Sequence, residues 1–337
     1  MQIGFSLVDL AMGGAQVFFV QLAQGLAARR HTLSYWLAAD SGDPQQVQPA
    51  LKAALDEVAR AVRHPWDLWQ ADIVHLDGYH SLGRKLFFLP RWGRCVETYH
   101  SAFSVRRAGP FYPPYRVAVS EAVLESLPVP AQIIYQGIPL PSASFDEADR
   151  RFDVAILGRI HPVKNHQLFL AVCEELYRQR GCCSALVIGG HARPGAYQRE
   201  IDAEIGRLRT LGINLQLTGD VPPEALWQWL SQARVLLVTS HSEGFGRMAV
   251  EAMACGVPVV VNPVGELMGT IQPGKTGFLA QRDDVDSFVE GTLRLLEDET
   301  LRRAMGQRGR AMAQERFSLE RMVTEYETLY HEIAQQA

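Results

Sequence analysis

Short apolar segments rich in β-branched residues alternate with helical patterns along the whole chain of 337 residues. Alternation of this kind is typical of parallel sheets with helices on both faces. In the second half the strand-like segments are almost wholly apolar, for example FDVAILG (152–158) and ARVLLVTS (233–240), as expected for strands that are buried on both faces. The sequence therefore predicts an α/β fold.

A polar, proline-containing segment, GIPLPSASFDEADRR (137–151), interrupts the alternation, which then restarts. The segment is typical of a linker, and the chain length favours two domains. We expect a doubly wound Rossmann-like domain over residues 1–145, a second over 146–315, and a C-terminal helix over 316–337 that packs back toward the first domain. The two domains are expected to face each other across a cleft, because ligands of doubly wound sheets bind beyond the carboxyl ends of the strands.

Composition and charge narrow the class of protein. A hydrophobic content of 47%, a charged content of 21% and a net charge of −4 are those of a soluble globular protein and give no argument for nucleic-acid binding. The five cysteines form no CxxC pair, the start MQIGFSLVDL lacks the features of a signal peptide, and no apolar run has the length of a membrane span. The sequence thus predicts a cytoplasmic protein with reduced thiols. It has no H-x-x-H motif and no acidic cluster, so we expect no metal site.

The segment HSEGFGRMAVEAMACG (241–256) follows a strand-like run and contains the beginning of a helical pattern. Its GFGRMA matches a G-x-G-x-x-A dinucleotide fingerprint, which also requires an acid about 20 residues further on. Here the next strand, VPVVVN, ends in Asn262, and the match lies deep in the second domain. We therefore reject a dinucleotide site.

A sugar nucleotide fits this segment better. Gly244 and Gly246 allow the backbone to approach a ligand closely, and the positive end of the following helix suits a phosphate. Glu243 and Glu251 can then meet hydroxyl groups on two different rings. The alternatives are a helix-N-terminal acid for Glu243 and an exposed surface acid for Glu251, although the apolar context MAVEAMACGVP makes an unpaired acid costly.

Three further loops carry candidate residues at strand ends. Arg159 and Lys164 lie in GRIHPVKNH (158–166), where they can neutralise a diphosphate or be ordinary surface cations. Gly13 and Gly14 form a phosphate-type turn, or merely a tight turn, after the first strand. His100 ends the strand candidate RCVETYH, where its side chain can take part in polar interactions at the site or simply pack against its neighbours.

These motifs resemble those of the retaining glycosyltransferases of family 4 (glycosyl transferases group 1), which have the two-domain GT-B fold. The resemblance extends from GGAQ, through YHS, VAVSE, GRIHPVKN, LVIGG and LTGDV, to SEGFGRMAVEAMACGVPVV and GKTGFL. The two glutamates Glu243 and Glu251, with seven residues between them, are its most specific element. The chain departs from the family at Gln16, where many members have glutamate, and at 136–139, which reads Gln-Gly-Ile-Pro.

The resemblance implies a role for each matching residue. Glu251 would bind the ribose, Glu243 the donor sugar, Arg159 and Lys164 the diphosphate, and His100 would lie near the reaction centre. Of these, we expect His100, Arg159, Lys164 and Glu243 to be catalytic. The remaining positions of the implied donor site are Gly13, Gly14, Gly190, Gly219, Val221, Gly244, Phe245, Gly246 and Arg247.

The implied reaction is transfer of a sugar from a nucleoside-diphosphate sugar, with UDP favoured over GDP, to an acceptor hydroxyl with retention of configuration. We favour front-face attack, in which the leaving phosphate takes the acceptor proton, without any cofactor or metal. The implied role is hexosyl transfer in the synthesis of surface polysaccharide, lipopolysaccharide or glycolipid. A sugar-nucleotide epimerase or hydrolase, or a non-catalytic nucleotide-binding subunit, are the alternatives.

Residues 84–116 contain seven basic side chains against the single acid Glu97, so their net charge is +6. Arg106 and Arg107, which have aromatic neighbours, are our candidates for the acceptor or membrane side. Such a surface suits a peripheral contact with an anionic membrane or an acidic glycan, and the alternative is a connecting loop with incidental arginines. We expect a membrane-associated acceptor that is met from the cytosolic side.

Overall fold

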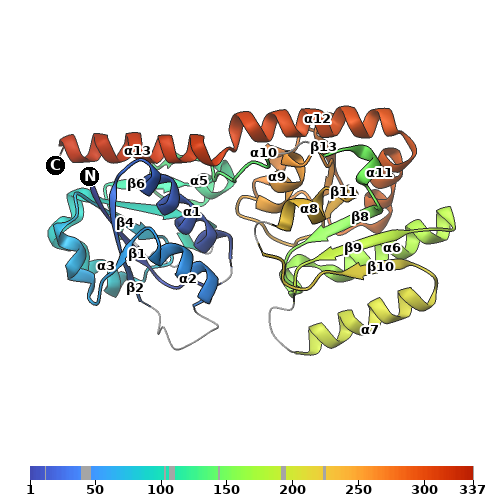
Figure 1. Ribbon diagram of the computed structural model, residues 1–337, viewed down its shortest axis with the longest axis horizontal. Coiled ribbons are helices and arrows are strands. Elements are labelled where there is room, and N and C mark those ends of the chain that lie inside the picture. The colour runs from blue at the N-terminus through green and yellow to red at the C-terminus, as the bar shows by residue number, and fades with distance from the viewer. Residues whose placement is uncertain are drawn as a thin grey trace. The chain divides into compact units, whose positions relative to one another are not determined.

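The computed structural model describes the chain in two compact units. The first contains Met1–Pro139 and Phe317–Ala337, and the second contains Leu140–Arg316 (Figure 1). The described residues are 1–11, 13–38, 47–101, 104–105, 111–142, 145–190, 195–222 and 225–336.

The first unit is built on seven parallel strands in the order β3-β2-β1-β4-β5-β6-β7. In this sheet Ile3 of β1 lies opposite Leu33 of β2 on one side and Ile73 of β4 on the other. The sheet therefore winds outward in both directions from β1, and the loop that follows β1 lies at its topological switch point. The strands are β1 (Gln2–Leu7), β2 (Thr32–Leu37), β3 (Arg60–Ala61), β4 (Ile73–Asp77), β5 (Cys95–Tyr99), β6 (Tyr115–Ala118) and β7 (Gln132–Ile133).

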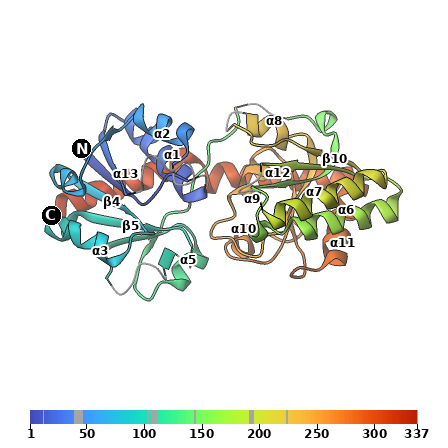
Figure 2. The ribbon, with the colours of Figure 1, turned by 90° about the horizontal axis from the view of Figure 1, so that it is seen from below.

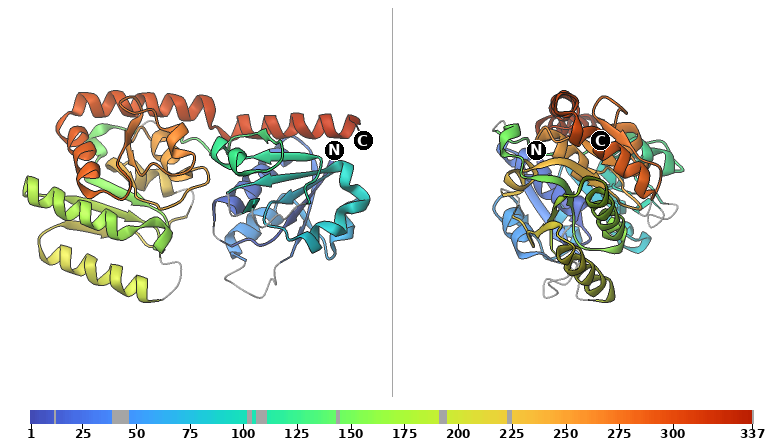
Figure 3. Two further views of the ribbon diagram at one scale, coloured as in Figure 1. Left: turned by 180° about the vertical axis from the view of Figure 1, so that it is seen from behind. Right: turned by 90° about the vertical axis from the view of Figure 1, so that its right-hand side faces the viewer.

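The two faces of this sheet are covered unequally. The larger core is formed with α1 (Gly14–Ala28), α2 (Pro49–Asp56) and α13 (Leu319–Gln336), which lies along this unit in Figures 1 and 3. The smaller core contains Leu68 and Phe88, which come from the short elements on the opposite face. These short elements are η1 (Pro65–Gln70), α3 (Leu82–Lys85) and η2 (Leu86–Arg94), and α5 (Glu121–Ser126) follows β6.

A buried polar network fastens α13 to the first sheet. His75 of β4 hydrogen-bonds through Nδ1 to the hydroxyl of Tyr330 at 2.5 Å and through Nε2 to Thr98 Oγ1 at 2.7 Å. The Tyr326 hydroxyl lies 2.9 Å from the same Thr98 oxygen. Burial holds the pKa of His75 well below its ordinary value, so the imidazole is a neutral part of the network.

The second unit has six parallel strands in the order β10-β9-β8-β11-β12-β13, with its switch point between β8 and β11. Its strands are β8 (Phe152–Leu157), β9 (Ser184–Ile188), β10 (Asn214–Leu217), β11 (Ala233–Val238), β12 (Val259–Val261) and β13 (Gly277–Leu279). The apolar segments 152–158 and 233–240 that the sequence analysis singled out contain β8 and β11, VPVVVN contains β12, and the α/β fold is confirmed.

Helices cover this second sheet. Apolar side chains of α6, α7 and α11 form its core with the strands, and Figure 2 shows α7 beside α6. The helices are α6 (His166–Arg180), α7 (Ala196–Thr210), α8 (Leu226–Leu230), α9 (Arg247–Ala254), α10 (Leu267–Thr270), α11 (Val285–Glu297) and α12 (Glu299–Arg316), with the short turns η3 (Glu147–Asp149) and η4 (Pro162–Lys164).

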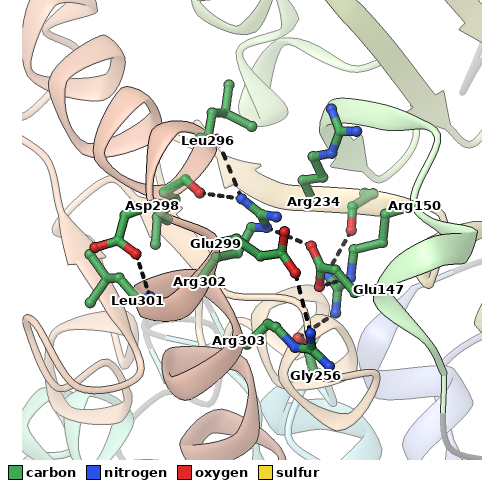
Figure 4. A network of polar contacts seen from close by, with 12 residues as sticks. Glu147, Arg150, Arg234, Gly256, Leu296, Asp298, Glu299, Leu301, Arg302 and Arg303 are labelled. Carbon is green, nitrogen blue, oxygen red and sulfur yellow. Dashed lines mark hydrogen bonds and ion pairs between the residues drawn. The ribbon is translucent and has the colours of Figure 1, made fainter.

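A second charge network lies at the amino ends of the strands of this unit (Figure 4). Glu147 accepts from Arg302 Nε at 2.6 Å and pairs with Arg150 Nε at 2.9 Å. Arg150 also donates to the carbonyls of Ala233 at 2.9 Å and Gly256 at 2.8 Å. The network thus joins the residues that precede β8 and β12 to the first residue of β11.

Candidate active site

The loop after β8 places Lys164 at the switch point of the second unit. Gly158 has a φ of +145°, and a Cβ there would lie 3.2 Å from Lys164 Cε, so the lysine stem packs on this glycine. The loop then forms η4, and Asn165, with a φ of +51°, caps α6 by accepting from the Leu168 amide at 3.3 Å. Arg159 lies in the same loop and is exposed.

Lys164 and Glu243 form an ion pair between two loops. The distance from Lys164 Nζ to Glu243 Oε1 is 2.6 Å, and the side chains are 19% and 11% exposed. Two further hydrogen bonds join the same loops: Thr239 Oγ1 donates to the Lys164 carbonyl at 2.8 Å, and the His241 amide donates to the Val163 carbonyl at 2.9 Å. The predicted cation and the predicted acid therefore lie together.

Glycines shape the backbone that leads into α9. Gly246 has a φ of +80°, and a Cβ there would lie 2.5 Å from Leu267 Cδ2. A Cβ on Gly265 would lie 1.7 Å from the Glu243 carbonyl oxygen, so only glycine allows this approach. Within the described residues no side chain caps α9 at Gly246, and such a helix end suits an anion.

Glu251 is buried inside α9 and is paired there. Its Oε1 accepts from Arg247 Nε at 2.6 Å, one helical turn away. Burial raises the pKa of Glu251, and the nearby charge of Arg247 opposes that rise. The alternative of an exposed surface acid is therefore wrong. The sequence analysis placed Arg247 in the donor site but did not predict its pair with Glu251, although the spacing of four residues is a signal for such a pair.

The glycines after β9 and β10 meet the β8 loop. The Ile160 amide donates to the Gly190 carbonyl at 2.8 Å, and a Cβ on Gly190 would lie 2.2 Å from Asp220 Oδ1. Gly219 has a φ of +70°, and the neighbouring Val221 is partly exposed. The structure thus brings Gly190 and the turn at Gly219, both predicted positions of the donor site, next to the loop that carries Arg159.

Asn262 lies at the strand end where a dinucleotide fingerprint would require an acid, and its side chain joins loops instead. Its side-chain amide donates to the Thr239 carbonyl at 2.9 Å and to Asp283 Oδ1 at 2.8 Å, and its own oxygen accepts from the Asp283 amide at 3.0 Å. The residue at the end of β12 therefore fastens the loops of the site to each other.

In the first unit, Gly13 caps α1 after the β1 loop, and Gly14 is exposed. Gln16 donates to Asp9 Oδ1 at 2.8 Å, a bond that a glutamate at this position could make only in its protonated form. Gln136 donates to the Gly14 carbonyl at 3.1 Å. The two departures from the family pattern thus support the glycine loop itself.

His100 is 8% exposed at the end of β5 and packs edge-on against Phe18, with ring centroids 4.8 Å apart. Neither ring nitrogen has a hydrogen-bond partner among the described residues. Burial lowers the pKa of His100 to about 3, so its imidazole is neutral near pH 7. A buried polar group of this kind is satisfied when a ligand supplies the partner.

Asp77 lies at the end of β4, opposite Thr98 of the strand that leads to His100, and it is an acid that the sequence analysis missed. It is 2% exposed, accepts from the Tyr79 amide at 3.2 Å, and burial raises its pKa to about 7. Its position directly after an apolar strand, in DIVHLDG, is the signal that could have found it.

In the basic stretch 84–116, several of the basic side chains are held by partners within the protein and do not form a solvated basic face. Lys85 is fully buried and pairs with the equally buried Glu97 at 2.7 Å. Arg91 and Arg116 donate to backbone carbonyls. Arg106 and Arg107 lie outside the described residues. Across the described part of the chain, no helix is both long and apolar enough to cross a bilayer.

Two doubly wound units with glycine loops at their switch points define a protein of the GT-B class. Residues 142–312 match the model of the family Glycosyl transferases group 1, so the chain belongs to that family and is a glycosyltransferase. Its fold is similar to that of a sucrose-phosphate synthase from Thermosynechococcus elongatus, with a TM-score of 0.80, 21% identity and full coverage of both chains. It is also similar to Anabaena HepE, solved in complex with UDP-glucose, with a TM-score of 0.77, 20% identity and coverage of 98% and 99%.

Two curated relatives show different extents of similarity. The chain is 28% identical to a D-inositol 3-phosphate glycosyltransferase of Kribbella flavida over 329 residues, which cover 85% of this chain and 76% of the relative. It is 39% identical to an N-acetyl-alpha-D-glucosaminyl L-malate synthase of Bacillus anthracis over 104 residues, 31% of this chain. That second match spans only 27% of the relative's own length.

Proposed function

We propose that this glycosyltransferase moves a hexosyl group from a nucleoside-diphosphate sugar, UDP ahead of GDP, to an acceptor hydroxyl with retention of configuration. The observation that carries the proposal is the Lys164–Glu243 pair, 2.6 Å long, at the switch point directly before α9. It offers a cation for a diphosphate beside an acid for sugar hydroxyls. UDP is favoured because the similar fold of Anabaena HepE has been solved with UDP-glucose.

In the proposed reaction negative charge develops on the leaving diphosphate. Lys164, Arg159 and the amino end of α9 stabilise this charge electrostatically. Glu243 accepts from hydroxyl groups of the donor sugar, and Glu251 accepts from those of the ribose. The leaving phosphate itself takes the proton of the attacking hydroxyl, and these fixed positive charges make a divalent metal unnecessary.

His100 contributes a neutral imidazole. Because its pKa is about 3, it serves as a hydrogen-bonding partner for a sugar hydroxyl and does not act as a general acid near pH 7. Among the described residues neither ring nitrogen has a hydrogen-bond partner, which supports this role.

We further propose that the acceptor belongs to a surface polysaccharide, lipopolysaccharide or glycolipid, and that the cytoplasmic enzyme meets it by peripheral contact with an anionic membrane. The support is the basic sequence Arg106-Arg107 among aromatic residues.

A two-stage experiment tests the proposed function. Thermal unfolding with UDP, GDP, UDP-glucose and GDP-mannose identifies the donor class, since a ligand that binds the folded state raises the melting temperature. Release of the nucleoside diphosphate is then measured with and without a glycolipid acceptor, and the anomeric configuration of the product is read by NMR. Acceptor-dependent release that survives EDTA and yields the retained anomer is expected. Inversion, or release that does not depend on acceptor, contradicts the proposal.

A further inference from the structure

Exposed apolar side chains gather on one side of the first unit. Eight large apolar side chains are exposed in the described residues, and six of them come from residues 66–89. The other two, Leu211 and Met268, lie in the second unit. We call the six the apolar patch: Trp66 (47% exposed), Trp69 (38%), Leu82 (43%), Leu86 (48%), Phe87 (43%) and Leu89 (46%).

The patch is continuous because its two segments touch. The Trp69 indole N–H donates to the Phe87 carbonyl at 2.9 Å, which joins η1 to η2. Each segment is anchored to the sheet by one fully buried side chain, Leu68 in η1 and Phe88 in η2, and both belong to the same small core. Trp92 of η2 packs partly buried against the same core, while the six side chains of the apolar patch stay exposed.

Cations border the patch. Arg60 and Arg63 line a cavity of about 330 Å³ together with Asp67 and Gln70, which come from the same turn as Trp66. Both arginines are exposed, and Asp67 is occupied in capping η1, where it accepts from the His64 amide at 3.0 Å. The cavity therefore carries two arginines against one aspartate, an excess of positive charge, beside Trp66 of the apolar patch.

We propose that the apolar patch and its two arginines dock this unit onto an anionic lipid bilayer. Tryptophan, phenylalanine and leucine side chains partition into the boundary between head groups and acyl chains. Guanidinium groups at the same level attract anionic head groups and bind their phosphates bidentately. This combination favours lipid over a protein partner. The inference rests on the membrane contact in the proposed function and replaces its basic stretch with a defined surface.

Vesicle flotation of the full chain tests the proposal. Vesicles contain phosphatidylcholine alone or phosphatidylcholine with phosphatidylglycerol, at low and high salt. The wild type is expected to float with the anionic vesicles at low salt and to bind less at high salt. The combined variant Trp66→Gln, Leu86→Gln and Phe87→Gln should bind anionic vesicles at least about tenfold more weakly, because each change removes an inserting apolar side chain.

Two further variants complete the test. Leu211→Gln with Met268→Gln removes equally exposed apolar side chains of the second unit and should bind like the wild type. Arg60→Gln with Arg63→Gln should lose about fivefold in binding for each arginine on anionic vesicles, and nothing on neutral ones. Quenching of tryptophan fluorescence by brominated lipid should fall in Trp66→Phe if Trp66 inserts.

The outcomes separate the patch from the rest of the proposed function. Equal loss of binding in the patch variant and in the Leu211/Met268 control overturns the inference, as does unchanged binding in the patch variant. Circular dichroism and the melting-temperature rise with UDP show whether the patch variant is folded. Failure of the wild type to bind any vesicle overturns the inference, while donor binding and sugar transfer are tested independently with soluble substrates.

Discussion

The structure offers two explanations for Lys164, and a pair of substitutions separates them. Its ammonium lies 2.6 Å from Glu243 Oε1, so it can serve the fold by neutralising a carboxylate or serve the reaction by stabilising the leaving diphosphate. Lys164→Met keeps the stem that packs on Gly158 and removes only the charge. Glu243→Gln keeps the shape of the acid and removes its charge.

The two explanations predict different magnitudes. With side chains 19% and 11% exposed, the pair is only partly desolvated, so Lys164→Met alone should cost about 1–2 kcal/mol in unfolding free energy. Adding Glu243→Gln should return most of that stability. For turnover, loss of one electrostatic group that faces a developing anion costs on the order of 100-fold, or about 3 kcal/mol. Glu243→Gln cannot return this loss, because the positive charge is still missing.

The assay is a double-mutant cycle in both quantities. Urea unfolding gives the stabilities, and UDP release at saturating donor and acceptor gives turnover. Lys275→Met, at an exposed lysine of the same unit, is the control and should change neither quantity. We expect the double variant to turn over about 100-fold more slowly than Glu243→Gln alone. If the two turn over equally, Lys164 acts only through Glu243 and the reasoning is wrong.

Three other expectations concern predicted site residues of the two units. Glu251→Gln should weaken binding of UDP and UDP-glucose by the same factor, at least about tenfold by calorimetry, since a hydrogen bond to a charged group is worth about 1.5–3 kcal/mol. Glu243→Gln should weaken only UDP-glucose, and equal loss of UDP binding in both variants contradicts this division of roles. Gly246→Ala and Gly274→Ala, with φ values of +80° and +73°, should each lose about 1–2 kcal/mol of unfolding free energy. Gly246→Ala should lose more of the two and also bind UDP more weakly, because of these two positions only Gly246 has a side chain within 4 Å of the added Cβ. Equal losses of stability refute that account. The pKa of His100 falls from its ordinary 6.5 to about 3 on folding, so between these values the unfolded chain binds more protons and the stability falls as the pH falls. From pH 7 to 5.5 the wild type should lose about 1 kcal/mol of unfolding free energy relative to His100→Phe in urea unfolding. Unfolding free energies of the two proteins that change in parallel with pH contradict this expectation.

The strands and the loops at their carboxyl ends could be predicted from the sequence, because both leave local signals. Apolar runs such as 152–158 and 233–240 are long enough to mark strands that are buried on both faces. A glycine-containing turn directly after such a run marks the edge where ligands bind. Lys164, Glu243 and Gly246 were found in this way, and β13, which has only three residues, was too short to be found.

Partners of side chains could be predicted only where they lie close in sequence. Arg247 and Glu251 are four residues apart on one helix, and their pairing was open to inference. Lys164 and Glu243 are 79 residues apart, and only the order of the strands in the sheet brings them together. The residues were therefore identified, while their ion pair was not.

Residues 84–89 show why counting charge along a sequence fails. The sequence Arg-Lys-Leu-Phe-Phe-Leu suggests basic residues outside and apolar residues inside, yet Lys85 is fully buried against Glu97 while Leu86, Phe87 and Leu89 are exposed. In η2 Phe88 is fully buried and Trp92 packs partly buried against the same core, while the other apolar side chains of this 3-10 segment are exposed. The direction of each side chain in such a segment therefore follows the local backbone and not its polarity, and part of an apolar run becomes surface. The exposed apolar side chains of residues 66–89 thus could not be predicted from charge, while the contact expected of Arg106 and Arg107, which lie outside the described residues, stays a prediction.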